Sequence, residues 1–172
     1  MIRSFNGKTP NIHPSAFVSE AAYVVGDVEI GEGSSVWPGA VVRGDTGHIK
    51  IGKNTAIEDN VVIHSGVPPE VDITIGDLVH IGHAAVVNCS KIGNNVLIGI
   101  NSTILHRAEI GNMCIIGAAA LVTEAMKIPD NSFVVGVPAV IKGQVQPKQL
   151  RWVTEAPMFY SGMGKQYKEE GR

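Results

Sequence analysis

The chain has 172 residues and a formal net charge of −2 at neutral pH. Its length provides room for one ordinary domain with a core, and its balanced charge gives no indication of nucleic-acid or membrane-surface binding. Residues 1–10 contain no apolar run typical of a signal peptide, and no apolar stretch of about 18 residues predicts a membrane span. Two lone cysteines, Cys89 and Cys114, do not suggest a disulfide framework, so we expect a cytoplasmic protein.

Most of the chain follows an apolar pattern with a period of six residues. Ile and Val together outnumber Leu by 41 to 5, and such an excess of β-branched residues favours strands. A period of six does not fit an amphipathic helix but is typical of a hexapeptide β-helix, in which three short strands form each coil. The regular series consists of Ile92, Ile98, Ile104, Ile110, Ile116, Val122, Ile128, Val134 and Val140.

The period begins loosely and is broken before this regular series. Residues 1–23 form an entry segment, and we expect the β-helix proper to begin near Val24. An interruption at residues 43–50 and a loop at residues 65–72 separate the first three coils, because Pro68-Pro69 cannot continue a central strand. The inward residues of these coils are Ile30, Val36 and Val42; Ile51, Ile57 and Ile63; and Ile75, Ile81 and Val87.

The last part of the chain has a different pattern. Pro147 suits the first turn of a helix, and Pro157 ends or kinks that helix. We therefore predict one or two helices in a segment of residues 144–172, packed on a β-helix domain of residues 1–143.

Stacked coils arrange their outward residues in columns, and two columns contain unexpected polar residues. The column after each third strand contains Arg43, His64, Asn88, Leu105, Thr123 and Ile141. The column after each second strand contains Trp37, Glu58, Gly82, Gly99 and Gly117, and His83 follows Gly82. A regular β-helix needs no charged or imidazole side chains at these positions, and consecutive coils are about 5 Å apart. The polar residues of the first three coils therefore indicate a candidate functional site.

Several motifs make the chain resemble the gamma-class carbonic anhydrases and their close homologues. These motifs are Val36-Trp-Pro-Gly-Ala-Val-Val-Arg-Gly-Asp45, the Ala56-Ile-Glu-Asp59 turn, Val62-Ile-His64, Ile81-Gly-His83, Leu97-Ile-Gly99 and the Gly136-Val-Pro-Ala139 exit. The resemblance covers nearly the whole chain. The Arg-Gly-Asp sequence with its spaced histidines is more specific than the six-residue repeat, which all hexapeptide proteins share.

The resemblance implies an all-β fold: a left-handed parallel β-helix of hexapeptide repeats with a C-terminal α-helix. It also implies a homotrimer in which histidines of neighbouring subunits bind zinc or another divalent metal such as iron or cobalt. His64 and His83 match two of the family's three histidine ligands, and Asn88 occupies the position of the third. His64 would come from one subunit and His83 from its neighbour.

Three further residues match positions that surround the metal in the family. Arg43 and Asp45 match an ion pair that shapes the site across the subunit interface. Glu58 matches a glutamine that hydrogen-bonds the solvent molecule on the metal. The family's acidic loop corresponds to residues 65–72, where Glu70 is the candidate for proton export.

The resemblance implies an enzyme that hydrates carbon dioxide to bicarbonate, a small-molecule substrate, and no nucleic-acid or membrane partner. Because an amide oxygen is a weaker zinc ligand than imidazole, Asn88 would weaken the metal site, and Glu58, His80 or His106 could complete the ligand set. Two alternatives stay open. One is a hexapeptide acyltransferase or thioesterase that acts on acyl-CoA, and the other is a non-catalytic trimeric homologue that has lost its third ligand.

Overall fold

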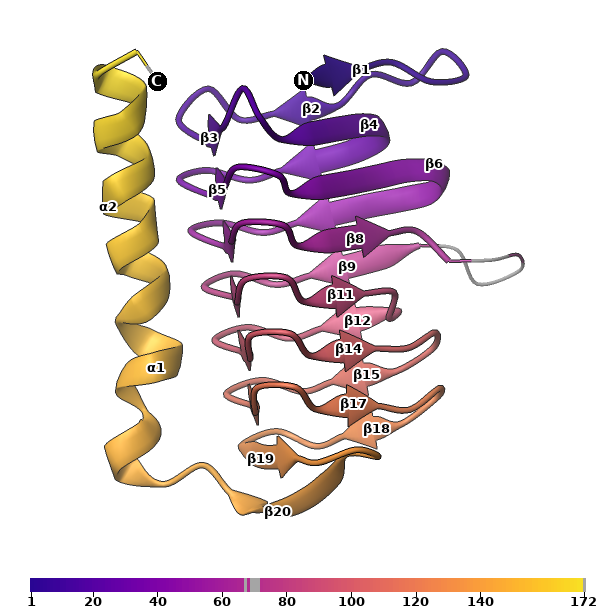
Figure 1. The fold of residues 1–172 in the computed structure, drawn as a ribbon, viewed down its shortest axis with the longest axis vertical. Coiled ribbons are helices and arrows are strands. Elements are labelled where there is room, and N and C mark those ends of the chain that lie inside the picture. Colours follow the sequence, from indigo (N-terminus) through magenta and orange to yellow (C-terminus); the bar gives the residue numbers. More distant parts are fainter. Residues whose placement is uncertain (67, 69–71, 172) are drawn as a thin grey trace.

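The structure is a computed structural model, and it describes residues 1–66, 68 and 72–171. The strands wind into a parallel β-helix, and a C-terminal helical segment runs back along one side of it (Figure 1). This architecture confirms the predicted left-handed parallel β-helix of hexapeptide repeats with a C-terminal α-helix. Among the described residues, no helix is both long and apolar enough to cross a lipid bilayer.

The strands form two sheets. β4 and β6 continue around one corner of the β-helix and join two of its three faces into one sheet of 12 strands. The remaining face, which contains the second strand of each coil and is called the second-strand face below, is a sheet of 8 strands. The larger sheet contains β1 (Ile2–Arg3), β2 (Asn11–Ile12), β4 (Tyr23–Ile30), β6 (Val41–Ile51), β8 (Val62–His64), β9 (Ile73–Ile75), β11 (Val86–Val87), β12 (Lys91–Ile92), β14 (Thr103–Ile104), β15 (Glu109–Ile110), β17 (Leu121–Val122) and β18 (Lys127–Ile128). The smaller sheet contains β3 (Phe17–Val18), β5 (Ser35–Val36), β7 (Ala56–Ile57), β10 (His80–Ile81), β13 (Leu97–Ile98), β16 (Ile115–Ile116), β19 (Ser132–Val135) and β20 (Val140–Gln144).

The start of the β-helix differs from the sequence expectation in two places. β1 pairs with β4 and β3 pairs with β5, so the coils begin at Ile2 rather than near Val24. Residues 43–50 are not an interruption, because they lie within the continuous strand β6. β4 and β6 pair on both sides of a register shift between Gly26 and Val28, and residues 45–48 bulge out of this pairing. The N–H groups of Gly47 and His48 donate instead to the Ser65 hydroxyl and the Asp72 carboxylate.

The last coil also differs from the expectation. β20 pairs with β19 in the antiparallel direction, so the chain reverses instead of continuing the period through Val140. Gly136 has a φ of +107°, a left-handed conformation that glycine adopts without steric cost and that permits this reversal. Ile141 therefore pairs with Val134 and does not join the column that contains Thr123.

The six-residue period gives the core of the β-helix. From Ile92 to Val134, every residue of the regular series is at most 3% exposed, whereas Val140 is 45% exposed. Full burial of such a side chain contributes about 1.5–3 kcal/mol relative to exposure. The expected stacking at 18-residue intervals is confirmed where the period is regular, because Ile92 pairs with Ile110 and Ile110 with Ile128.

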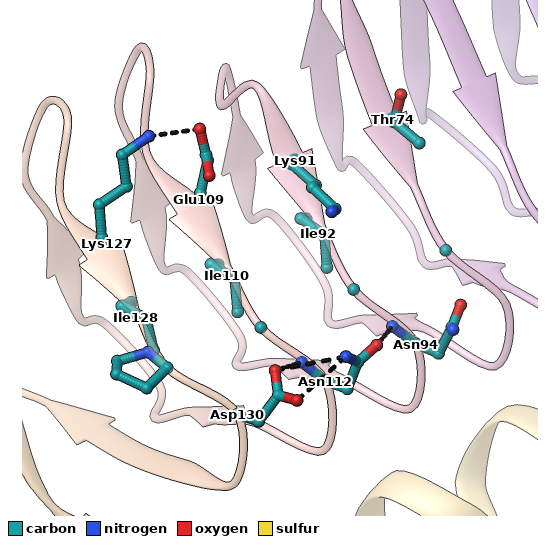
Figure 2. A pocket seen from close by; sticks show the side chains of 14 residues that line it. Thr74, Lys91, Ile92, Asn94, Glu109, Ile110, Asn112, Lys127, Ile128 and Asp130 are labelled. Carbon is teal, nitrogen blue, oxygen red and sulfur yellow. Dashed lines mark hydrogen bonds and ion pairs between the residues drawn. The ribbon is translucent and has the colours of Figure 1, made fainter.

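A ladder of side-chain-to-backbone hydrogen bonds connects the coils at one corner. The Asp77 N–H donates to Asn94 Oδ1 at 2.8 Å. The Asn94 N–H donates to Asn112 Oδ1 at 2.9 Å, and the Asn112 N–H donates to Asp130 Oδ1 at 2.7 Å (Figure 2). Each bond satisfies a backbone donor at a turn, so the coil register is fixed at this corner as well as in the strands.

The C-terminal segment consists of η1 (Pro147–Gln149), α1 (Arg151–Thr154) and α2 (Ala156–Glu169). α2 contacts the second-strand face at β3, β5 and β7. Its Tyr160 and Tyr167 pack on the buried Trp37, with ring centroids 5.8 and 5.1 Å away, and Phe17 completes the aromatic cluster. These large apolar contacts fix the helical segment against the outer side of the β-helix.

Gly99→Ala is expected to destabilise the β-helix. A methyl group at Gly99 would lie 2.4 Å from the backbone nitrogen of Ala118 in the next coil, so the coils would have to separate locally. We expect a loss of about 1–3 kcal/mol in the free energy of unfolding, measured by urea denaturation. Gly162→Ala is the matched control. Gly162 is exposed in α2, a methyl group added there would meet no atom within 4 Å, and alanine favours a helix. Equal losses for the two substitutions would contradict this account.

Candidate functional site

The first group of site residues lies in the column formed by the residues that directly follow the third strand of each coil. β6 pairs with β8 so that Arg43 is opposite His64, and Ile63 pairs with Val87, the residue before Asn88. Arg43, His64 and Asn88 therefore stack on consecutive coils, as their spacing predicts. All three follow an inward residue, so their side chains emerge at an outer corner of the β-helix.

Arg43, Asp45 and His64 form a closed polar cluster at this corner. Arg43 Nη1 is 2.5 Å from Asp45 Oδ2, and Arg43 Nη2 is 3.2 Å from His64 Nδ1. His64 Nε2 is 3.1 Å from Asp45 Oδ1. A guanidinium group can only donate, so His64 Nδ1 is the acceptor and His64 Nε2 donates its proton to Asp45. Both nitrogens of the imidazole are thus held in place.

Asp45 is a carboxylate that orients His64. Burial would raise the pKa of Asp45, but the hydrogen bonds from Arg43 and His64 and the charge of Arg43 outweigh this, so the pKa lies below its ordinary value. A carboxylate bonded to one ring nitrogen is the usual arrangement around metal-binding histidines. The Arg43–Asp45 pair is therefore placed to control the orientation of the imidazole.

Asn88 contacts the same histidine from the next coil. Its amide nitrogen donates a hydrogen bond to the backbone carbonyl of His64. Because this bond uses the nitrogen, the amide oxygen is the atom that a metal or a water molecule could use. An oxygen donor suits several divalent metals, although zinc binds imidazole more strongly.

Glu58 and His83 lie at the next corner. The pairing of β7 with β10 places Glu58 beside Gly82 in the second-strand column. Glu58 Oε2 accepts a hydrogen bond from the His83 backbone N–H at 2.8 Å and is 3.2 Å from His83 Nε2. His83 Nδ1 is 3.0 Å from Asp59 Oδ2. Because 46% of the His83 side chain is exposed, the imidazole is accessible to a second chain.

Glu58 is 2% exposed and has two further partners. His80 Nε2 is 2.9 Å from Glu58 Oε1, and the Tyr160 hydroxyl of α2 is hydrogen-bonded to the same carboxylate. Burial would raise the pKa of Glu58, but the hydrogen bonds from His80 and Tyr160 lower it below its ordinary value. Burial and the adjacent Glu58 carboxylate raise the pKa of Tyr160, so at neutral pH Glu58 is ionised and Tyr160 is protonated.

The two clusters lie at opposite edges of one face, because β8 runs from the Glu58 corner to the His64 corner. In the described part of a single chain, no group of three or more His, Cys, Asp or Glu residues could hold a metal ion. Of the other residues expected as a possible third ligand, His80 is hydrogen-bonded to Glu58 and does not join the His64 cluster. His106 lies on a later coil, and no hydrogen bond or ion pair of the described residues joins it to either cluster. Glu70 lies outside the described residues.

Two residues near the site were missed by the sequence analysis. Asp59 contacts His83, and an acidic residue directly after Glu58 in the same turn was a usable signal. Tyr160 contacts Glu58 from α2, and no spacing or motif in the sequence indicates that this helix reaches the corner. The Tyr160 hydroxyl, together with His80 and His83, explains how the Glu58 carboxylate can stay ionised while it is almost completely buried.

Comparisons with known proteins connect this chain to a family. A family model described as bacterial transferase hexapeptide (six repeats) matches residues 89–124. A carbonic anhydrase of Geobacillus kaustophilus is 38% identical over 168 residues, which cover 98% of this chain and 91% of that protein. The mitochondrial gamma carbonic anhydrase 1 of Arabidopsis thaliana is 33% identical over 167 residues, which cover 95% of this chain but 61% of that protein.

A solved structure agrees with the fold. The crystal structure of a hexapeptide transferase family protein from Anaplasma phagocytophilum superposes with a TM-score of 0.91 and 28% identity, covering 97% of this chain and 98% of that chain. The similar proteins thus include carbonic anhydrases and a member of a transferase family. They define fold and ancestry, and the activity has to be argued from the site residues.

Asp45→Asn is expected to destabilise the protein at neutral pH but not in acid. The folded-state pKa of Asp45 is below its ordinary value of 3.8, so its stabilising contribution is complete above that value and is lost as the pH falls through the folded-state pKa. We expect a loss of about 1 kcal/mol at pH ~7 that disappears near pH ~2. Urea denaturation at one fixed protein concentration measures both values. A difference that does not change with pH would show that the charge of Asp45 is not responsible.

Proposed function

This chain belongs to the gamma carbonic anhydrase-like family of hexapeptide-repeat proteins, and on this basis we propose that it hydrates carbon dioxide to bicarbonate with a divalent metal shared by two subunits of a homotrimer. The observation that supports this most is the division of the site residues. His64 is held by Arg43 and Asp45 at one corner, and His83 is held beside Glu58 at the next corner. A single described chain does not bring three ligands together, so a complete site requires a second copy.

The proposed ligands are His64 and Asn88 of one subunit and His83 of its neighbour. Two imidazoles and an oxygen are a donor set that zinc, iron and cobalt accept. In a single chain both nitrogens of each imidazole have partners, so a metal would replace Arg43 at His64 Nδ1 and Glu58 at His83 Nε2. Asp45 and Asp59 would keep the other two nitrogens oriented. The bound metal supplies the Lewis acidity that activates water for attack on carbon dioxide.

The remaining site residues orient the water and the ligands. Glu58 is ionised and held by His80 and Tyr160, so it is suited to orient the substrate water by accepting a hydrogen bond from it. Arg43 and Asp45 fix the tautomer and the direction of the His64 ring. Their role is positioning, because they act through His64.

The face between the two corners supports the proposed homotrimer. It is formed by β8, β11, β14 and β17 with the first part of β6, and it exposes Val62 and Val86 to 36% and 40%. Exposed aliphatic residues on a flat strand surface favour burial against another copy. In the proposed trimer, this face of each subunit would lie toward the three-fold axis. The His64 corner of each subunit would then meet the His83 corner of the next, and three such head-to-tail contacts would close the ring.

A shared site predicts complementation between two inactive variants. His64→Ala and His83→Ala should each lose bound metal and carbon dioxide hydration, because each removes one ligand from every interface. When the two variants are co-expressed, random assembly restores about one quarter of the interfaces. Metal content and hydration rate should recover to that level.

His13→Ala is the control for this experiment. His13 is an exposed residue bonded to Ser15, far from either cluster in the chain, and its removal should change neither quantity. If co-expression restores nothing while light scattering shows trimers, the ligands do not come from different subunits. A stable monomer would contradict both the trimer and the shared site.

Asn88→His is expected to strengthen the metal site. It replaces an amide oxygen by imidazole, a better zinc ligand, and should tighten metal binding by about tenfold or more. Thr123→His is the matched control, because Thr123 lies in the same column two coils further on, away from both clusters. Competition with a metal-sensitive dye gives both affinities. An unchanged affinity for Asn88→His would exclude Asn88 from the ligand set.

Acyl transfer or hydrolysis of an acyl-CoA is a second candidate function. The transferase description of the matching repeat model and the likeness to the Anaplasma protein support it. The pairing of His80 with the ionised Glu58 is also the arrangement that makes an imidazole a general base. Turnover of acetyl-CoA by protein freed of metal would favour this function. A non-catalytic trimer would show neither acetyl-CoA turnover nor carbon dioxide hydration.

A further inference from the structure

Both ring nitrogens of His64 are in contact with another side chain. Arg43 Nη2 is 3.2 Å from His64 Nδ1, and Asp45 Oδ1 is 3.1 Å from His64 Nε2. A metal ion binds an imidazole through one of these two nitrogens. It therefore has to displace either Arg43 or Asp45 before it can bind His64.

Arg43 is the partner that can leave. Its side chain is 43% exposed, against 19% for Asp45, so the guanidinium group has room to move into solvent. It is also held to Asp45 through its other nitrogen, Nη1, and a shift of Nη2 away from His64 can keep that ion pair. Asp45, by contrast, is the kind of carboxylate that supports a metal-binding histidine from the far side of the ring.

Arg43 and a metal ion are alternatives at His64 Nδ1 on electrostatic grounds as well. A guanidinium group stays charged in proteins, so it would repel a divalent cation bound to the same nitrogen. Metal binding at Nδ1 thus has to break the hydrogen bond from Arg43. A hydrogen bond to a charged group contributes enough free energy to change an affinity by about tenfold.

A second cluster of a cation, an aspartate and a histidine lacks this contact. The Asp27 carboxylate is bonded to the Lys8 ammonium group and is 2.9 Å from His48 Nδ1. Among the described residues, the Lys8 ammonium group bonds Asp27 and does not bond His48. An aspartate can therefore hold an imidazole without a cation on the ring, and the contact from Arg43 to His64 is an additional feature of the candidate site.

We infer that Arg43 competes with the metal for His64 Nδ1 and that this competition limits how tightly the site binds metal. The inference rests on the proposed function, because it takes His64 as a metal ligand. Asp45 stays bonded to Nε2 whether Arg43 or the metal occupies Nδ1. Arg43 is thus the exchangeable partner of His64, and Asp45 is the permanent one.

The zinc affinity of the full-length protein, stripped of metal and titrated in competition with a metal-sensitive dye, tests this competition. Arg43→Met leaves Nδ1 open and should bind zinc about tenfold more tightly than the unmodified protein. Arg43→Lys keeps the charge but lacks the planar fork that reaches Asp45 and His64 together, so it should also bind zinc more tightly. A gain for Arg43→Met alone would show that only the net charge matters, and it would overturn the inference.

Lys8→Met is the matched control, because it removes a cation from an aspartate that bonds a histidine but opens no nitrogen of His64. Its zinc affinity should equal that of the unmodified protein, and an equal gain would contradict the inference. Light scattering compares the assembly states, and Arg43→Lys decides if Arg43→Met assembles differently. If the unmodified protein binds zinc and neither Arg43 variant binds it more tightly, the inference fails and the proposed function stands. If none of these proteins binds zinc, the proposed function fails and the inference with it.

Discussion

The in-register hydrogen bonding between consecutive coils is the constraint on which the rest of this structure depends. Each strand donates to and accepts from the strands above and below it, and the buried Ile and Val side chains hold the coils together from inside. A shift by one residue would turn these inward side chains outward. The register therefore cannot change without losing the core, and it fixes where every outward side chain emerges.

This constraint creates the two polar corners. Arg43, His64 and Asn88 are far apart in the sequence but are neighbours because their coils are stacked. Imidazole and guanidinium groups at an outer corner keep partial contact with water, so they cost the fold little. Glu58 is the exception, because the C-terminal segment covers it. Its burial is tolerated only because His80, His83 and Tyr160 surround the carboxylate with hydrogen bonds.

The C-terminal segment thus has two roles in the proposed chemistry. Through Trp37 and Tyr160 it is packed on the second-strand face, and its Trp152 and Tyr160 line one side of an open pocket beside Glu58. The face on the other side of the Glu58 corner stays uncovered, with exposed Val62 and Val86. One side of this corner is therefore covered by the chain's own helical segment, while the described chain leaves the other side open. In the proposed homotrimer, a reaction at the corner would take place between this helical segment and the neighbouring subunit.

The sequence by itself determined the β-helix, because a six-residue period of Ile and Val leaves no other regular structure that buries them. It also determined the columns of Arg43, His64 and Asn88, since stacking follows from the period. Apolar spacing did not predict the path of the chain in two places. Residues 43–50 bulge around a corner within β6, and the chain reverses at Gly136, so that Val140 leaves the core. Backbone pairing decides both paths. Only the tertiary structure brought Tyr160 to Glu58 and Trp152 to the pocket beside it. Those contacts depend on how a distant helix packs on a finished surface, and no periodicity encodes that packing.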